Sequence, residues 1–225
     1  MIFAFGDSIM KGIVTDQQRL DRDTIKYIIS DGGFANRIGC PVRNLSRFGS
    51  TVIAGQRHLQ RHLAEIHPGD KVVLEFGGND CNYDWSAVAA DPTGHYSPTV
   101  SLRDFRTIYE QMIRCIRGVG AEPVLLSLPP LLPPRFFDFV SQGLNAANIL
   151  AWLGGDVNTT ANWHEQYNLE VFKTGTRHGV EVIDISSIFL AQRGLDDYYC
   201  IDGMHPNERG HALIAEAIAE TCVLA

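Results

Sequence analysis

Three residues with the side chains of a nucleophilic triad stand near the two ends of the sequence. Ser8 follows a short apolar run, and Asp202 and His205 stand three positions apart shortly before a C-terminal helical pattern. A serine hydroxyl is too weak an acid to attack an acyl carbonyl unaided, so it needs a histidine as general base. A carboxylate beside that histidine fixes its tautomer and stabilises the imidazolium. The three residues therefore favour acyl-transfer chemistry.

Other polar and glycine-rich motifs follow apolar runs in the same way. One run is followed by Asn44-Leu45-Ser46-Arg47-Phe48-Gly49-Ser50-Thr51, and another by Gly77-Gly78-Asn79-Asp80. In an open α/β sheet, ligands bind at the carboxyl ends of the strands. We therefore expect a nucleophile, a glycine turn, an amide side chain and an acid–base pair to meet at one edge of one sheet.

Short β-rich runs alternate with longer helical patterns along the chain. The expected strands are residues 2–5, 42–45, 71–76, 123–128 and 180–185, of which 72–74 and 124–126 are continuously apolar, as in strands buried on both faces. The expected helices are residues 33–38, 52–65, 102–118, 163–178 and 207–222. This alternation predicts the α/β class, as a three-layer α/β/α sandwich around a five-stranded parallel sheet. Nothing in the composition breaks residues 1–225 into more than a single domain.

Three segments do not fit the alternation, namely residues 11–32, 81–99 and 127–155. Each follows the carboxyl end of an expected strand, where long loops often form the walls or lids of a site. The second and third contain prolines and aromatic residues. We therefore expect Tyr83, Trp85 and Phe136 to contact the substrate.

The four motifs together resemble those of the SGNH/GDSL hydrolases. A single motif such as Gly-Asp-Ser is common by chance, but here all four occur in the family's order and span nearly the whole chain. One departure is Ile9, which stands where many members have leucine and which concerns packing rather than chemistry. The matching stretches are Gly6-Asp7-Ser8, Gly49 within Phe-Gly-Ser-Thr, Gly77-Gly78-Asn79-Asp80 (GxND) and Asp202-Gly203-Met204-His205-Pro206 (DxxHP).

The resemblance implies a role for each site residue. Ser8 would be the nucleophile, His205 the general base and Asp202 the acid that orients it. The oxyanion would be held by the backbone N–H groups of Ser8 and Gly49 and by the side-chain amide of Asn79. One such donor stabilises the transition state by roughly 3 kcal/mol. With these residues we expect a flavodoxin-like sandwich.

Two more aspartates stand next to the proposed site residues. Asp7 precedes the nucleophile, but neighbouring side chains at a strand end diverge, so we expect it to brace the turn rather than to orient the histidine. Asp80 follows Asn79, and we expect it to hold the loop that carries the amide.

Composition argues against several other classes of protein. The net charge of −7 disfavours binding to nucleic acid, whose phosphates require a basic face. No stretch approaches the roughly 18 apolar residues that span a membrane, and the N-terminus lacks the basic region of a secretory signal. The five cysteines include no CxxC pair. We therefore expect a cytoplasmic protein whose cysteines are reduced thiols.

The sequence thus predicts a serine esterase that hydrolyses carboxylic esters through an acyl-Ser8 intermediate. Short acyl groups, such as O-acetyl groups on carbohydrates, are the expected substrates, and a small acyl ester is the expected partner. No metal or organic cofactor is expected, because a triad and an oxyanion hole supply the whole mechanism. An acyltransferase or thioesterase with the same site, or a catalytically silent binding module, are the alternatives. The sequence does not determine the length of the acyl chain, the alcohol or thiol half of the substrate, or the oligomeric state.

Overall fold

Within residues 1–16 and 25–222, which the computed structural model describes, the centre of the fold is a parallel sheet of five strands. Its strand order is β4-β1-β5-β6-β7, and every neighbouring pair is parallel. Numbered along the chain, this is the flavodoxin-like order, so the predicted class and sandwich are confirmed. The strands are β1 (Ile2–Gly6), β4 (Val42–Asn44), β5 (Lys71–Glu75), β6 (Glu122–Leu126) and β7 (Glu181–Ile183).

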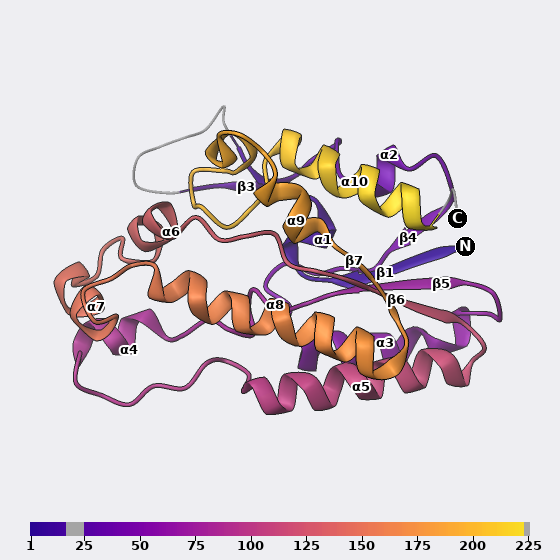
Figure 1. Cartoon of the computed structure of the whole chain (residues 1–225), viewed down its shortest axis with the longest axis horizontal. Coiled ribbons are helices and arrows are strands. Elements are labelled where there is room, and N and C mark those ends of the chain that lie inside the picture. Colours follow the sequence, from indigo (N-terminus) through magenta and orange to yellow (C-terminus); the bar gives the residue numbers. More distant parts are fainter. Residues whose placement is uncertain (17–24, 223–225) are drawn as a thin grey trace.

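Helices cover both faces of the sheet (Figure 1). Successive side chains of a strand point to opposite faces. Phe3 and Phe5 of β1 therefore pack into a core with α3 (Val52–His62), α5 (Leu102–Gly118) and α8 (Thr159–His178). Ile2 and Ala4 pack on the other side, together with helices of a second core. Those helices are α1 (Ser8–Lys11), α2 (Phe34–Arg37), α9 (Ile185–Leu190) and α10 (Glu208–Cys222).

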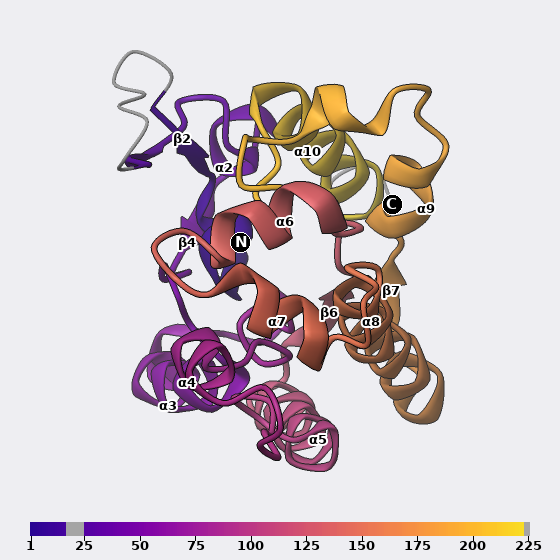
Figure 2. The ribbon, with the colours of Figure 1, turned by 90° about the vertical axis from the view of Figure 1, so that its left-hand side faces the viewer.

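The segments that do not fit the alternation carry elements of their own. Residues 11–32 hold β2 (Ile13–Thr15) and β3 (Tyr27–Ile29), which pair antiparallel, while 17–24 lie outside the described residues. The other two segments supply α4 (Trp85–Ala90), α6 (Pro133–Val140) and α7 (Ala146–Trp152). These three helices gather at one end of the sheet (Figure 2), where they share a third apolar cluster. They form a wall at the carboxyl edge.

The largest differences from the expected elements lie at α8 and at the end of the sheet. Helix α8 begins at Thr159 rather than at residue 163. Strand β7 ends at Ile183 because the Asp184 side chain accepts a hydrogen bond from Ser187 N and caps α9. The end of α3 tightens into a 3₁₀ turn at Leu63–Glu65, and a second 3₁₀ turn spans Leu195–Tyr198.

Two further observations bear on where the chain resides. Among the described helices, none combines the length and the apolar character needed to cross a membrane. In the same part of the chain, four cysteines are free thiols: Cys40, Cys81, Cys115 and Cys200.

Candidate active site

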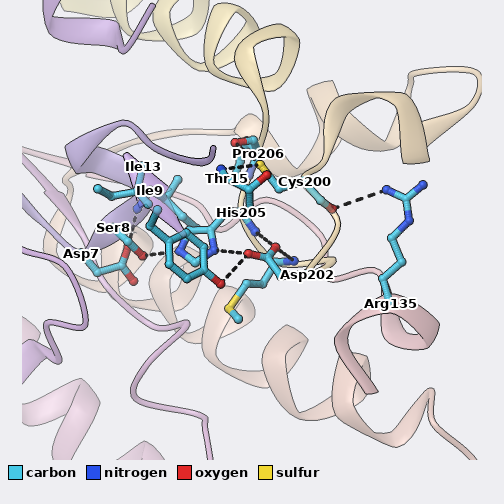
Figure 3. Close-up of polar contacts among 12 residues, drawn as sticks. Asp7, Ser8, Ile9, Ile13, Thr15, Arg135, Cys200, Asp202, His205 and Pro206 are labelled. Carbon is cyan, nitrogen blue, oxygen red and sulfur yellow. Dashed lines mark hydrogen bonds and ion pairs between the residues drawn. The ribbon is translucent and has the colours of Figure 1, made fainter. Parts of the chain in front are cut away.

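Ser8, His205 and Asp202 lie together at the carboxyl edge of the sheet, joined by hydrogen bonds (Figure 3). His205 Nε2 is 2.8 Å from Ser8 Oγ, and His205 Nδ1 is 2.8 Å from Asp202 Oδ2. All three residues are buried. In this arrangement Ser8 can pass its proton to Nε2 while the carboxylate accepts a hydrogen bond from Nδ1.

A tight turn folds Asp202 back onto the histidine. Asp202 Oδ1 accepts hydrogen bonds from the backbone N–H groups of Met204 and His205, both at 3.0 Å. Gly203, between Asp202 and Met204, has φ +71°, and a Cβ there would lie 2.8 Å from the carbonyl oxygen of Leu132. Only glycine suits this conformation and this close approach. Leu132 N in turn donates to Gly203 O at 2.9 Å, which ties the start of α6 to the turn.

Tyr27 of β3 is the second side chain, after His205, that donates to the Asp202 carboxylate. Its hydroxyl donates to Asp202 Oδ2 at 2.9 Å, and its ring lies 5.0 Å from the His205 ring. Burial alone would raise the pKa of Asp202, but its hydrogen bonds to His205 and the charge of that residue hold the pKa below its ordinary value. Burial, with the nearby carboxylate, raises the pKa of Tyr27, so it stays a donor. The Phe48 ring stacks on the His205 ring with centroids 6.0 Å apart, and it also lies 5.3 Å from the Tyr27 ring, so the three rings form one cluster.

The residues expected to hold an oxyanion surround Ser8. Ser8, Gly49 and Asn79 line one pocket, and Gly49 has φ +69°. The N–H groups of Ser8 and Gly49 donate to no other residue in the described part of the chain. The Asn79 amide is engaged, because Nδ2 donates to Asp7 Oδ2 at 2.9 Å and to Ser50 O at 3.2 Å. Two donors are therefore open to a ligand, and the third is bound within the protein.

Asp7 braces the turn after β1 and contacts a buried acid, Glu75. Its Oδ1 accepts from Ile9 N at 2.8 Å, which caps α1, and its own N–H donates to Glu75 Oε2 at 3.3 Å. Burial raises the pKa of both acids, and the charge of Asp7 adds to the rise at Glu75. Ionisation of one acid therefore opposes ionisation of the other.

Asp80 holds the loop between β4 and α3. Its Oδ1 accepts from Val52 N at 2.9 Å, at the first residue of α3. Its Oδ2 is buried and has no partner among the described residues. Burial is the main cause that raises the pKa of Asp80 to about 7. It fixes the helix that follows the Gly49 turn.

A pocket of about 290 Å³ opens at Ser8. The three residues expected to contact substrate, Tyr83, Trp85 and Phe136, all line it. None of the described lining residues is lysine or arginine, and no three metal-ligating side chains gather anywhere in residues 1–16 and 25–222. The remaining lining residues are Asp7, Ser8, Ile9, Tyr27, Phe48, Gly49, Gly78, Asn79, Cys81, Asn82, Leu131, Phe139, Thr160, Trp163, His164, Met204 and His205.

Sequence reasoning missed Tyr27, Phe48, Glu75 and His164. Phe48 stands beside Gly49 in a stretch that was identified, and Glu75 is an acid at the end of an apolar run. A charged residue in a strand buried on both faces is unusual and signals a partner. No local signal pointed to Tyr27 or to His164.

Comparisons with solved structures agree with the fold. A search of curated proteins found no match. Among solved structures, the lipase/acylhydrolase from Enterococcus faecalis has a TM-score of 0.66 at 18% identity, covering 97% of this chain and 93% of that one. TesA has a TM-score of 0.61 at 19% identity, covering 99% and 98%. The esterase EstA from Pseudoalteromonas sp. has a TM-score of 0.58 at 13% identity, covering 98% and 94%. Such likenesses show the fold.

The family is shown by the sequence itself. The model of the GDSL-like Lipase/Acylhydrolase family matches residues 4–213, from β1 into α10. That span includes Ser8, Asp202, His205, the Gly49 turn and Asn79. The chain therefore belongs to the GDSL-like lipase/acylhydrolase family, and it is an enzyme of the SGNH hydrolase type.

Proposed function

We propose that this chain is a serine esterase that hydrolyses carboxylic esters through an acyl-Ser8 intermediate. The observation that carries the proposal is the continuous line of hydrogen bonds from Ser8 Oγ through His205 to Asp202, with both links at 2.8 Å. This is the connectivity that activates a serine for attack on an acyl carbon.

The reaction follows as two displacements. Ser8 Oγ forms a bond to the acyl carbon while its proton moves to His205 Nε2. The bond between the acyl carbon and the alcohol oxygen then breaks, and His205 returns the proton to that leaving oxygen. Water repeats the sequence on the acyl-enzyme, giving up a proton to His205 and releasing the acid and free Ser8. Asp202 stays ionised throughout and stabilises the imidazolium.

The oxyanion is assigned to Ser8 N, Gly49 N and Asn79 Nδ2. The first two are open in the free protein, whereas Asn79 donates to Asp7 and to Ser50 O. The bond to Ser50 O is the longer, at 3.2 Å. We assign that N–H to the oxyanion, while the bond to Asp7 keeps the amide oriented. Exchange of a neutral acceptor for an anion strengthens the hydrogen bond.

The pocket supports short acyl esters as substrates. Its volume of about 290 Å³ and its aromatic walls fit a small acyl chain, and the same aromatic faces suit one face of an acetylated sugar ring. The compared EstA structure is of a form inhibited by monoethylphosphonate. A phosphonate that modifies serine is therefore a suitable probe here. The four free thiols support the predicted cytoplasmic location.

The test is intact mass after treatment with a small fluorophosphonate, beside Ser8→Ala and heat-denatured protein. One adduct on native protein only, lost in Ser8→Ala, is expected. Folded protein without an adduct would contradict the proposal and favour a silent binding module. Ester hydrolysis with and without added alcohols then separates an esterase from an acyltransferase, and matched thioesters test for thioesterase activity.

A further inference from the structure

The wall of the pocket formed by α8 carries a histidine without a partner. Thr160, Trp163 and His164, from the first turns of α8, line the pocket. His164 is only 6% exposed. Its ring nitrogens have no hydrogen-bond partner among the described residues, and its side chain lines the cavity. A buried polar group left unpaired is costly, so such a group in a pocket indicates a ligand.

The protonation state of His164 defines what it can bind. Burial lowers its pKa to about 4, so the ring is neutral at neutral pH, with one nitrogen as donor and one as acceptor. Two further donors beside His164 have no acceptor in the described part of the chain. They are Trp163 Nε1 on α8 and the hydroxyl of Tyr83, whose ring packs against Trp163 with centroids 4.7 Å apart. The wall therefore offers several donors in apolar surroundings.

This set of groups selects a neutral ligand atom. An anion would be buried without a counter-charge, because none of the described residues that line the pocket is lysine or arginine. A cation could not use the N–H and O–H donors. A neutral oxygen can accept from these donors without bringing a charge into the pocket.

We propose that the α8 wall is a subsite for a neutral oxygen-bearing group of the substrate, a hydroxyl, carbonyl or ether, with His164 as the residue that determines specificity. The proposal rests on the esterase function proposed above. The oxygen can belong to the acyl half or to the alcohol half of the ester, and the same donors would serve either.

The test uses pairs of esters that differ by one atom. In each pair an ether oxygen replaces one methylene, and its position is moved along the acyl chain in one series and along the alcohol chain in another. At the position that meets His164, kcat/KM of the ether should exceed that of the all-carbon ester by about two- to tenfold, the effect of one hydrogen bond. The series that shows this optimum assigns the subsite to one half of the ester.

Variants connect the preference to His164. In His164→Leu the preference should reverse, because the ether oxygen then loses its hydration without gaining a partner. His164→Gln, which keeps a donor, should retain part of it. Phe139→Leu, an apolar change in the α6 wall, should affect both members of a pair alike.

Two outcomes separate failure of the subsite from failure of the function. The subsite alone is overturned if the enzyme takes the phosphonate on Ser8 in one sample and hydrolyses esters in an untreated sample, yet prefers the all-carbon ester at every position or keeps the same ratio in His164→Leu. Folded enzyme that takes no phosphonate on Ser8 and hydrolyses no ester overturns the proposed function, and the subsite with it.

Discussion

Replacement of Glu75 by glutamine should change how the stability of the fold depends on pH. Glu75 is fully buried, and its Oε2 accepts a hydrogen bond from the backbone N–H of Asp7. Its Oε1 has no hydrogen-bond partner among the described residues, and burial together with the nearby Asp7 charge raises the pKa of Glu75 well above its ordinary value. Glutamine keeps the shape, the donor and the acceptor but cannot release a proton. Glu75→Gln therefore removes one titration and little else.

The magnitude follows from counting protons. Above roughly pH 5 both acids are ionised in the unfolded chain, whereas we expect the native pair to retain one proton because burial raises both pKa values. The native state then binds one proton more, so the free energy of unfolding falls as pH rises, by about 1.4 kcal/mol per pH unit. This loss starts near the ordinary pKa of glutamate and ends at the raised native pKa of Glu75. Glu75→Gln lacks this loss. Between about pH 5 and pH 7 the free energy of unfolding of the variant should therefore rise by about 2.7 kcal/mol relative to that of the wild type.

Urea unfolding at a series of pH values measures this difference directly. Asp80, whose pKa is about 7, also titrates in this range, but it is present in both proteins and cancels. Glu181→Gln, at an exposed position of β7, controls for the loss of one charge on the surface. Parallel curves for wild type and Glu75→Gln would refute the reasoning, since they would mean that Glu75 is ionised in the native protein.

Three other substitutions test separate parts of the site. Asn79→Ala should lower kcat by about 10²–10³, the effect of one oxyanion donor; a loss below tenfold in ester hydrolysis would remove Asn79 from the oxyanion hole. Tyr27→Phe should move the acid limb of the kcat/KM profile to higher pH, because Asp202 then stabilises the imidazolium more strongly; an unshifted profile would contradict this. Gly203→Ala should destabilise the fold by roughly 1–3 kcal/mol through backbone strain, which thermal unfolding would detect.

The fold and the placement of Ser8 and His205 could be predicted because they follow from a topological rule. The two residues are 197 positions apart, yet their side chains are 2.8 Å apart. Each follows a strand of a parallel sheet, and the carboxyl ends of such strands meet at one edge. Recognition of β1 and β7 from their apolar runs was therefore sufficient to bring the two motifs together.

The contact between Glu75 and Asp7 needed the register of the sheet as well as its order. Gly6 is paired with Glu75 across β1 and β5, which places Asp7 beside the Glu75 carboxyl group. The apolar patterns of these strands identify them as buried, but they do not fix which residues face each other, because nearly every position is apolar. An acid in β5 indicated a partner without indicating which one.

Tyr27 and His164 could not be found for different physical reasons. Tyr27 stands on a three-residue strand whose partner, β2, is reached across a long connection, so no tight-turn signal marks the pair. His164 lies near the start of α8, where Thr159 and Thr160 are β-branched residues of low helix propensity. The expected helix of residues 163–178 includes His164 but omits Thr160, which also lines the pocket, so the sequence did not indicate that this end of α8 borders the site.

The acids on the two sides of Ser8 differ in how many hydrogen-bond donors they have, and this difference sets which of them is ionised more easily. Asp202 receives four hydrogen bonds, from Tyr27, Met204 and twice from His205, and these keep it ionised on the histidine side. On the oxyanion side, Glu75 Oε1 and Asp80 Oδ2 receive none from the described residues, and burial raises the pKa of both acids. A fully ionised cluster there would repel an oxyanion formed beside Ser8. Keeping that cluster partly protonated therefore favours negative charge on the substrate, while the ionised Asp202 favours positive charge on the histidine.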